Sequence, residues 1–268
     1  MLYYQHLTSF WIDLIVFIVG LCIGSFLNVV IVRLPKKESI ISPGSKCPKC
    51  GHRLRWWENI PLISFIILKG RCSKCSEPIS IQYPIVELIT AILSVCLWLK
   101  YHFNIYMFLG YLYFVCSLIA IFFIDLKHHI IPDVISLPGI VIGILMFVVV
   151  QGLSPKESLI GAVVGAGIFE LIRLGYFFVT KREGMGFGDV KLMGMIGAFL
   201  GWLYIPIVIF FSALIGTIYA FLLMFLNKAK RDTRIPYGPF LAIAALIALF
   251  FGPQILAFYR DLMFGRWF

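Results

Sequence analysis

Residues 105–124 read IYMFLGYLYFVCSLIAIFFI, a continuous run without a single charge. Because about 20 apolar helical residues cross the roughly 30 Å hydrocarbon core of a bilayer, this run predicts a transmembrane helix. The whole chain has the same character: 61% of its 268 residues are hydrophobic and 13% are charged, with a mean hydropathy of +0.96. Too few polar residues remain to cover a water-facing surface. This excludes an ordinary soluble domain, a disordered tail and a secreted disulfide scaffold.

The apolar runs divide the chain into eight segments. A membrane β-barrel would instead show short stretches of alternating hydrophobicity, so we predict an all-α, polytopic membrane protein with about eight transmembrane helices. The segments are 10–32, 84–100, 105–124, 134–151, 158–179, 190–203, 205–226 and 238–258. The sixth is short, and its boundary with the seventh falls near Tyr204. We expect the first to be retained rather than cleaved as a signal peptide, because no Lys or Arg precedes it and basic residues follow it.

Three G-x-x-x-G pairs lie within these segments, and such pairs are typical of close helix packing in membranes. They are Gly20/Gly24, Gly161/Gly165 and Gly197/Gly201.

The basic residues predict the orientation. The net charge is +10, and residues 33–83 hold ten Lys and Arg against three acids. An excess of Lys and Arg marks cytoplasmic loops, so we expect this loop inside and, after eight crossings, both termini outside. Residues 127, 181, 182, 228, 230, 231 and 234, all basic, then also lie inside. This predicts three parts: a first transmembrane helix at 1–32, a cytoplasmic loop domain at 33–83 and a transmembrane domain at 84–268.

Four of the seven cysteines form two C-x-x-C pairs in that loop, Cys47/Cys50 and Cys72/Cys75, separated by 21 residues. This spacing is typical of four thiolates around one structural Zn²⁺, which would also stabilise a domain too small for a large core. A redox C-x-x-C is the alternative, although it needs only one pair in a βαβ setting. Disulfides are not expected in the cytoplasm. Cys22, Cys96 and Cys116 lie within apolar segments and are expected to be packing residues.

The basic loop admits two kinds of partner. Nucleic acid is one, but a loop held against anionic lipid headgroups is the simpler interpretation. Trp56, Trp57 and the apolar run 60–68 favour the lipid, because nine residues cannot span a bilayer but can lie at its interface. We therefore expect the lipid bilayer, and no nucleic acid, as a partner of this loop.

Two acidic residues lie at the ends of apolar segments where ionisable groups are costly and often functional. Asp125 closes the third segment and Asp189 opens the sixth, after Gly184, Gly186 and Gly188. The crossing count puts both at the cytoplasmic boundary, where they could share a site and a proton, as in an aspartic protease. Alternatively, Asp189 is a helix N-cap and Asp125 is a boundary residue in contact with headgroups. Two further acids have structural explanations: Glu170 can pair with Arg173, and Asp133 is a helix start signal.

Several motifs, taken together and in order, resemble those of the type IV prepilin peptidases. The opening motif is GSFLNVVIVRLP at 24–35, followed by the paired cysteines with ENIP at 58–61 between them. The resemblance continues with IS at 79–80, YPIVE at 83–87, Asp125, IPD at 131–133, GFGDVKL at 186–192 and PYGP at 236–239. These motifs extend over most of the chain, and both aspartate motifs are intact.

This resemblance implies a bifunctional enzyme of the bacterial inner membrane. Members cut the basic leader of prepilin or pseudopilin precursors at the cytoplasmic face, typically after a glycine, and then methylate the new amino terminus with S-adenosylmethionine. Asp125 and Asp189 match the family's two catalytic aspartates, and the loop with Cys47, Cys50, Cys72 and Cys75 is associated with methylation. The resemblance assigns no residues to the methyl donor.

Two other classes of protein fit parts of the sequence. A proton- or cation-coupled transporter could use Asp125 and Asp189 as a relay beside a zinc-binding regulatory loop. Transporters, however, place coupling residues near the bilayer midplane and often in repeated halves, and no repeat is evident here. A zinc-binding scaffold would leave the boundary aspartates unexplained.

Overall fold

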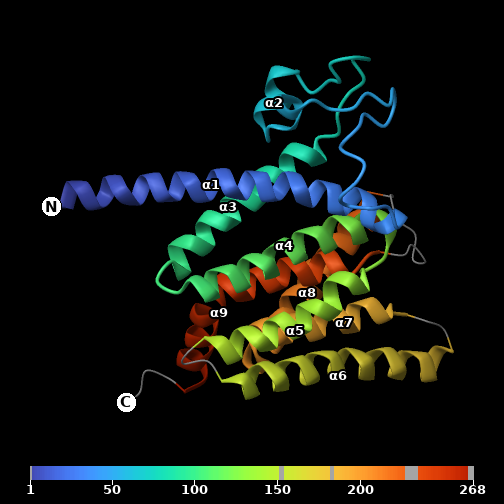
Figure 1. Ribbon diagram of the computed structural model, residues 1–268. Coiled ribbons are helices and arrows are strands. Elements are labelled where there is room, and N and C mark those ends of the chain that lie inside the picture. Colours follow the sequence, from blue (N-terminus) through green and yellow to red (C-terminus); the bar gives the residue numbers. More distant parts are fainter. Residues whose placement is uncertain (1, 151–153, 182–183, 227–234, 265–268) are drawn as a thin grey trace. The chain divides into compact units, whose positions relative to one another are not determined.

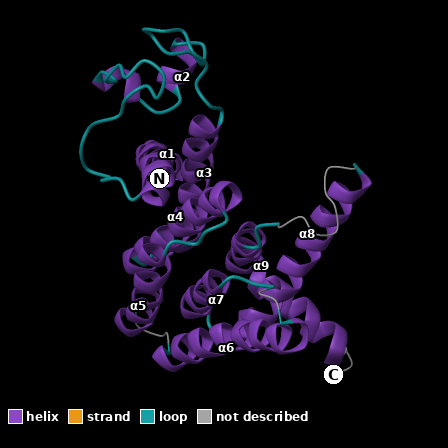
Figure 2. Cartoon of the chain, turned by 90° about the vertical axis from the view of Figure 1, so that its right-hand side faces the viewer, coloured by secondary structure: helices purple, strands orange, loops and turns teal. Residues whose placement is uncertain are grey.

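The computed structural model of the protein describes residues 2–150, 154–181, 184–226 and 235–264. Within these residues the chain is helical and contains no β-strand, only two isolated bridges in the cysteine loop (Figures 1 and 2). The α-helices are α1 (Leu2–Arg33), α2 (Ile63–Ile67), α3 (Gln82–Tyr101), α4 (Ile105–His128), α5 (Asp133–Val149), α6 (Pro155–Thr180), α7 (Phe187–Leu200), α8 (Ile205–Phe225) and α9 (Gly238–Phe264). The all-α membrane fold predicted from the sequence is therefore confirmed.

The eight predicted segments correspond to α1 and to α3 through α9. Six of these helices are long and apolar enough to cross a membrane, whereas α5 has 17 residues and α7 has 14. At 1.5 Å per residue α7 is about 21 Å long, less than the thickness of the hydrocarbon core. The boundary near Tyr204 is a short 3₁₀ turn, Trp202–Tyr204, which follows Gly201, a glycine with a positive φ of 82°. Of the basic residues assigned to the cytoplasm, Arg182, Lys228, Lys230, Arg231 and Arg234 lie outside the described residues.

The chain divides into two compact units, residues 1–120 and 121–268, and the division falls within α4. In the first unit α1 packs against α3 through the first G-x-x-x-G pair. A Cβ at Gly20 would lie 2.7 Å from the Cα of Ala91, and one at Gly24 would lie 2.6 Å from the Cα of Glu87. These two glycines therefore allow the two backbones to approach closely, as the sequence predicts.

The cysteine loop belongs to the same unit and joins α1 to α3. It contains the 3₁₀ turn Trp56–Asn59 and the short helix α2. Its apolar side chains at Trp56, Ile66 and Ile67 are exposed, with fractions of 82%, 72% and 67%. An apolar surface of this kind suits the membrane interface, where we predicted residues 56–68 to lie.

In the second unit α7 is buried along almost its whole length. Gly161 on α6 faces Gly197 on α7 so closely that a Cβ on either residue would collide with the carbonyl of the other. The hydroxyl of Ser158 on α6 also donates to the carbonyl of Ala198 at 2.6 Å. On α5, a Cβ at Gly143 would lie 2.9 Å from the Cβ of Ala198. Glycine thus lets α5 and α6 enclose α7, and a helix enclosed in this way is apolar all round.

Candidate active site and metal centre

Asp125 lies in the last turn of α4 and is 5% exposed. Its Oδ2 accepts a hydrogen bond of 2.9 Å from the backbone N–H of Gly238, the first residue of α9. After α4 the chain turns through His129, whose left-handed backbone lets its N–H donate to the carbonyl of Asp125. The His129 side chain lies close enough to interact electrostatically with the Asp125 carboxylate.

Asp189 lies in the first turn of α7 and is 8% exposed. The helix begins after Gly186, whose carbonyl accepts the N–H of Asp189 at 3.2 Å. Asp189 is therefore inside the first turn rather than at the N-cap. The carboxyl groups of Asp189 and Asp125 are close enough to repel each other electrostatically. The structure thus brings together the two aspartates that the sequence singled out.

The side chain of Ile131 packs against the backbone beside both aspartates. A Cβ at Gly188 would lie 2.9 Å from the Cβ of Ile131, and one at Gly238 would lie 3.3 Å from its Cδ1. Ile131 therefore packs on the residue before Asp189 and on the residue that hydrogen-bonds to Asp125. The part that Ile131 and Gly238 play in the aspartate site was not predicted from the sequence. The only signal was their presence in the short motifs at 131–133 and 236–239.

Tyr237 lies beside this site. Its hydroxyl and that of Ser212 on α8 are 2.8 Å apart, and its side chain interacts electrostatically with Asp189. In the sequence, Tyr237 is marked only by its place in the motif at 236–239.

An ion pair joins the starts of α5 and α7. The ammonium of Lys191, two residues after Asp189, donates to both carboxylate oxygens of Asp133 at 2.7 Å. Asp133 is the first residue of α5, as predicted from its position after Pro132. The sequence did not predict this pair, but the pair that it did predict is present on α6, where Arg173 contacts Glu170 at 2.6 Å.

The four loop cysteines converge at one point in the first unit. Their sulfur atoms all lie within 4.8 Å of one another. The Sγ atoms of Cys47 and Cys75 are 3.9 Å apart, and those of Cys50 and Cys72 are 4.0 Å apart. A tetrahedral Zn²⁺ with Zn–S bonds of about 2.3 Å places its sulfurs about 3.8 Å apart. The cluster therefore has the donors and the spacing that zinc requires.

Backbone N–H groups favour the thiolate form of Cys72. Those of Cys75 and Lys74 lower the pKa of the Cys72 thiol to about 6. The first knuckle turns through Gly51 in a left-handed conformation, with a hydrogen bond of 3.0 Å from its N–H to the carbonyl of Cys47. Burial and the neighbouring cysteine side chains raise the pKa of Cys75 to about 12. Metal ligation by cysteine requires the thiolate form, so Cys72 is the ligand that its turn prepares.

A buried carboxylate connects the two knuckles. Glu58 is 6% exposed, and its Oε2 accepts the backbone N–H of Arg55 at 2.6 Å and lies 3.2 Å from Nε2 of His52. Its Oε1 accepts the hydroxyl of Ser73, which lies within the second knuckle. The N–H of Arg55 and the other two donors lower the pKa of Glu58, so it is held as the carboxylate. This role of Glu58 was not predicted from the sequence.

Comparison with known proteins gives two matching families. Residues 18–101 match the bacterial peptidase A24 N-terminal domain, and residues 112–221 match the type IV leader peptidase family. The chain is 39% identical to a prepilin leader peptidase/N-methyltransferase of Pseudomonas aeruginosa, with 90% of this chain and 91% of that protein covered. It is 38% identical to one from Aeromonas salmonicida (91% and 92% covered) and 37% identical to one from Legionella pneumophila (92% and 93% covered). No solved structure shows a significant match.

Proposed function

The chain belongs to the type IV leader peptidase family, and we propose that it cleaves the leader from type IV prepilin or pseudopilin precursors and then N-methylates the new amino terminus. The relatives that match nearly the whole chain carry both activities in their names, which supports a peptidase and a methyltransferase in one protein.

The observation that carries the peptidase proposal is the buried pair of Asp125 and Asp189. Both carboxyl groups are at least nine-tenths buried, and they repel each other. We infer that the pair holds a single proton, because ionising two buried carboxyl groups that repel each other is costly. The ionised member then takes a proton from water, which attacks the scissile carbonyl carbon, while the protonated member donates a hydrogen bond to the carbonyl oxygen. Collapse of the tetrahedral intermediate breaks the C–N bond, and the leaving amine takes the proton that the aspartate removed from water.

The neighbours of the pair support this chemistry by fixing its position. The Gly238 N–H fixes one carboxyl oxygen of Asp125. Asp189 is fixed by the first turn of the buried helix α7, which Lys191 holds to α5 through Asp133. A rigid pair of this kind needs little reorganisation during the reaction.

The proposed site lies at the cytoplasmic face of the bacterial inner membrane. Asp125 ends a helix that can cross the membrane, and Lys127 and His128 follow it in the last turn. Basic residues at a helix end mark the cytoplasmic side. A prepilin has a basic leader followed by an apolar helix, so its cleavage point would lie at the same level as Asp125.

Two groups complete the proposed function. Cys47, Cys50, Cys72 and Cys75 would hold a structural Zn²⁺ that cross-links the loop. S-Adenosylmethionine, when bound, supplies the activated methyl group for N-methylation.

The test is cleavage of a full-length prepilin-like precursor in liposomes, followed by mass spectrometry. Wild type is compared with Asp125→Asn and Asp189→Asn, each with and without S-adenosylmethionine. We expect wild type to release the leader and, with the methyl donor, to add the mass of one methyl group. Each substitution should abolish cleavage without unfolding the protein. Asp261→Asn, at an exposed carboxylate on α9, is the matched control and should cleave normally.

Cleavage that survives either substitution would exclude the aspartate pair as the catalytic centre. A transporter that used the pair as a relay would lose ion flux in these variants, so the same liposomes can be assayed for flux.

A further inference from the structure

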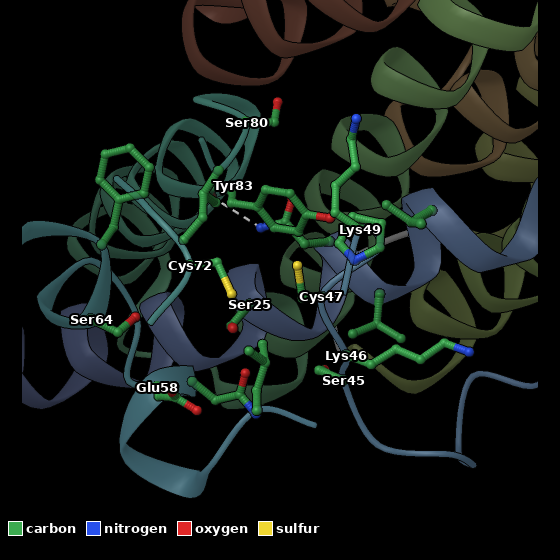
Figure 3. A pocket seen from close by; sticks show the side chains of 18 of the residues that line it. Ser25, Ser45, Lys46, Cys47, Lys49, Glu58, Ser64, Cys72, Ser80 and Tyr83 are labelled. Carbon is green, nitrogen blue, oxygen red and sulfur yellow. Dashed lines mark hydrogen bonds between the residues drawn. The ribbon is translucent and has the colours of Figure 1, made fainter. Parts of the chain in front are cut away.

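The first unit contains a cavity of about 710 Å³ that the proposed cleavage site does not use. It is lined by the cytoplasmic end of α1, by the cysteine loop and by the first two turns of α3 (Figure 3). Pockets for small molecules and cofactors usually measure about 300–1,000 Å³. Its volume and its enclosure by three segments therefore fit a ligand of cofactor size.

Asn28 on α1 supplies an unpaired acceptor at this cavity. The residue is 2% exposed, and its Nδ2 donates to the backbone carbonyl of Tyr83 at 3.0 Å. Because the Tyr83 carbonyl can only accept, the Nδ2 of Asn28 must face it, which fixes the orientation of the Asn28 side-chain amide. The Oδ1 of Asn28 is then left without a hydrogen-bond partner. Buried polar atoms are almost always paired in proteins, so a donor group of a ligand in the cavity would complete this one.

The charges around the cavity have both signs. Glu87 on α3 is 7% exposed, and its Oε2 accepts the backbone N–H of Leu62 at 2.9 Å. Lys36, Lys46 and Lys49 line the cavity as well, and Figure 3 shows Lys46 and Lys49 on the opposite side of the view from Glu58. Burying a carboxylate is costly unless an opposite charge or a hydrogen bond compensates it. Arg33, Glu38 and Glu77 line the cavity too, and Lys49 pairs with Glu77 at 3.4 Å. Acidic and basic side chains are therefore both available to a ligand that carries a cation and an anion.

Aromatic and apolar side chains complete the lining. Tyr83 and Phe65 contribute rings, and Val29, Val32 and Leu68 contribute aliphatic surface. A planar heterocycle would pack on such surfaces while its polar edge bonds to nearby amides and hydroxyls.

We propose that this cavity is the binding site of the methyl donor S-adenosylmethionine. This inference rests on the methyl transfer in the proposed function. The ligand has a sulfonium and an ammonium for the Glu87 side, a carboxylate for the lysines, N–H donors for Asn28 and an adenine for the rings.

The test is binding of radiolabelled S-adenosylmethionine to the purified full-length protein in nanodiscs. Glu87→Gln removes the charge but keeps an oxygen for the Leu62 N–H, and Asn28→Leu removes the unpaired acceptor at similar volume. We expect each variant to raise Kd at least tenfold while precursor cleavage stays within about twofold of wild type. Glu157→Gln, at an exposed carboxylate on α6, is the matched control and should bind as wild type does.

Photocrosslinking with an azido-adenine analogue gives a second readout that does not depend on how the variants fold. Label in the peptides that contain residues 25–33, 62–68 or 79–87 supports the proposal, and label confined to other parts of the chain overturns it.

The outcomes distinguish a failure of the cavity assignment from a failure of the proposed methyl transfer. If wild type methylates the product and both folded variants bind the donor as tightly as wild type, the cavity assignment is wrong and the function stands. If wild type neither binds the donor nor adds a methyl group, the methyltransferase proposal and the cavity assignment both fail. A phospholipid or a leader peptide that occupies the cavity without lowering the affinity for the donor would also overturn the assignment.

Discussion

The backbone N–H of Gly238 donates a 2.9 Å hydrogen bond to the buried carboxylate of Asp125, across 113 residues of sequence. The bond joins the start of α9 to the end of α4. A Cβ on Gly238 would lie 2.7 Å from Oδ2 of Asp125, so only glycine leaves room for this contact. The position of Asp125 therefore depends on a residue that carries no side chain.

Gly238→Ala should impair cleavage strongly. The added methyl group would push the Asp125 carboxylate away from Gly238, and a displacement of about 1 Å at a catalytic group can cost on the order of 100-fold in rate. Single-turnover cleavage of a prepilin-like precursor measures the effect. Gly175→Ala on α6 is the matched control, because a Cβ there meets no atom within 4 Å. Equal rates for the two variants would contradict a positioning role for Gly238.

Most of the helices could be predicted from the sequence, because apolar runs of bilayer length leave little choice of structure. Residues 105–124 became the greater part of α4, and Gly20 and Gly24 became a packing face, as expected. The length of α7 was harder to predict. Its apolar residues face α5 and α6 rather than lipid, and an enclosed helix has the same composition as a membrane-spanning one.

The candidate site could be predicted only in part. The spacing of the cysteines indicates a tetrahedral cluster, because each C-x-x-C turn places its own two sulfur atoms for metal ligation. The crossing count brings Asp125 and Asp189 to one level, and the structure places them within electrostatic reach, although their catalytic role stays a prediction. The contributions of Gly238 and Ile131 could not be predicted, because they arise from packing between segments that are far apart in the sequence.

The ion pair between Lys191 and Asp133 should help to position Asp189 by holding the start of α7 to α5. Asp133→Asn and Lys191→Met should each lower kcat several-fold and leave KM for the precursor nearly unchanged. The pair is partly exposed, with side-chain fractions of 19% for Lys191 and 56% for Asp133. We therefore expect a coupling energy of about 0.5–1 kcal/mol in a double-mutant cycle on kcat. Strictly additive effects would show that the two residues act independently.

The stability of the second unit should depend on the close contact between Gly161 and Gly197. Gly161→Ala or Gly197→Ala would force α6 and α7 apart, and overpacking of this kind costs about 1–3 kcal/mol. Thermal unfolding in detergent should show a lower Tm for both variants. Gly167→Ala on the same helix meets no atom within 4 Å and should leave Tm unchanged or raise it slightly. If all three variants had the same Tm, the close approach of α6 and α7 would be unimportant for stability.

Metal analysis should find one zinc ion per chain in the purified protein. Cys47→Ser or Cys72→Ser should lose the zinc, because three thiolates and a serine hydroxyl bind it far more weakly. Amide hydrogen exchange in residues 45–80 should then become faster. Cys116→Ser, outside the cluster, should keep its zinc and serves as the control. Full zinc content in the Cys47 and Cys72 variants would place the metal elsewhere.

Glu58 should stabilise the cysteine loop in a pH-dependent manner. Its carboxylate joins the turn at Arg55 to Ser73 in the second knuckle, and these contacts lower its pKa below the ordinary value of 4.5. A group whose pKa is lowered on folding contributes stability above its unfolded pKa and loses that contribution as the pH falls through its folded pKa. Glu58→Gln should therefore speed amide exchange in the loop by a constant factor at all pH values above 4.5, and the difference should shrink only below that. Glu77→Gln, at a half-exposed carboxylate paired with Lys49, gives the comparison for a surface acid. An effect of Glu58→Gln no larger than that of Glu77→Gln would mean that the buried carboxylate does not hold the knuckles together.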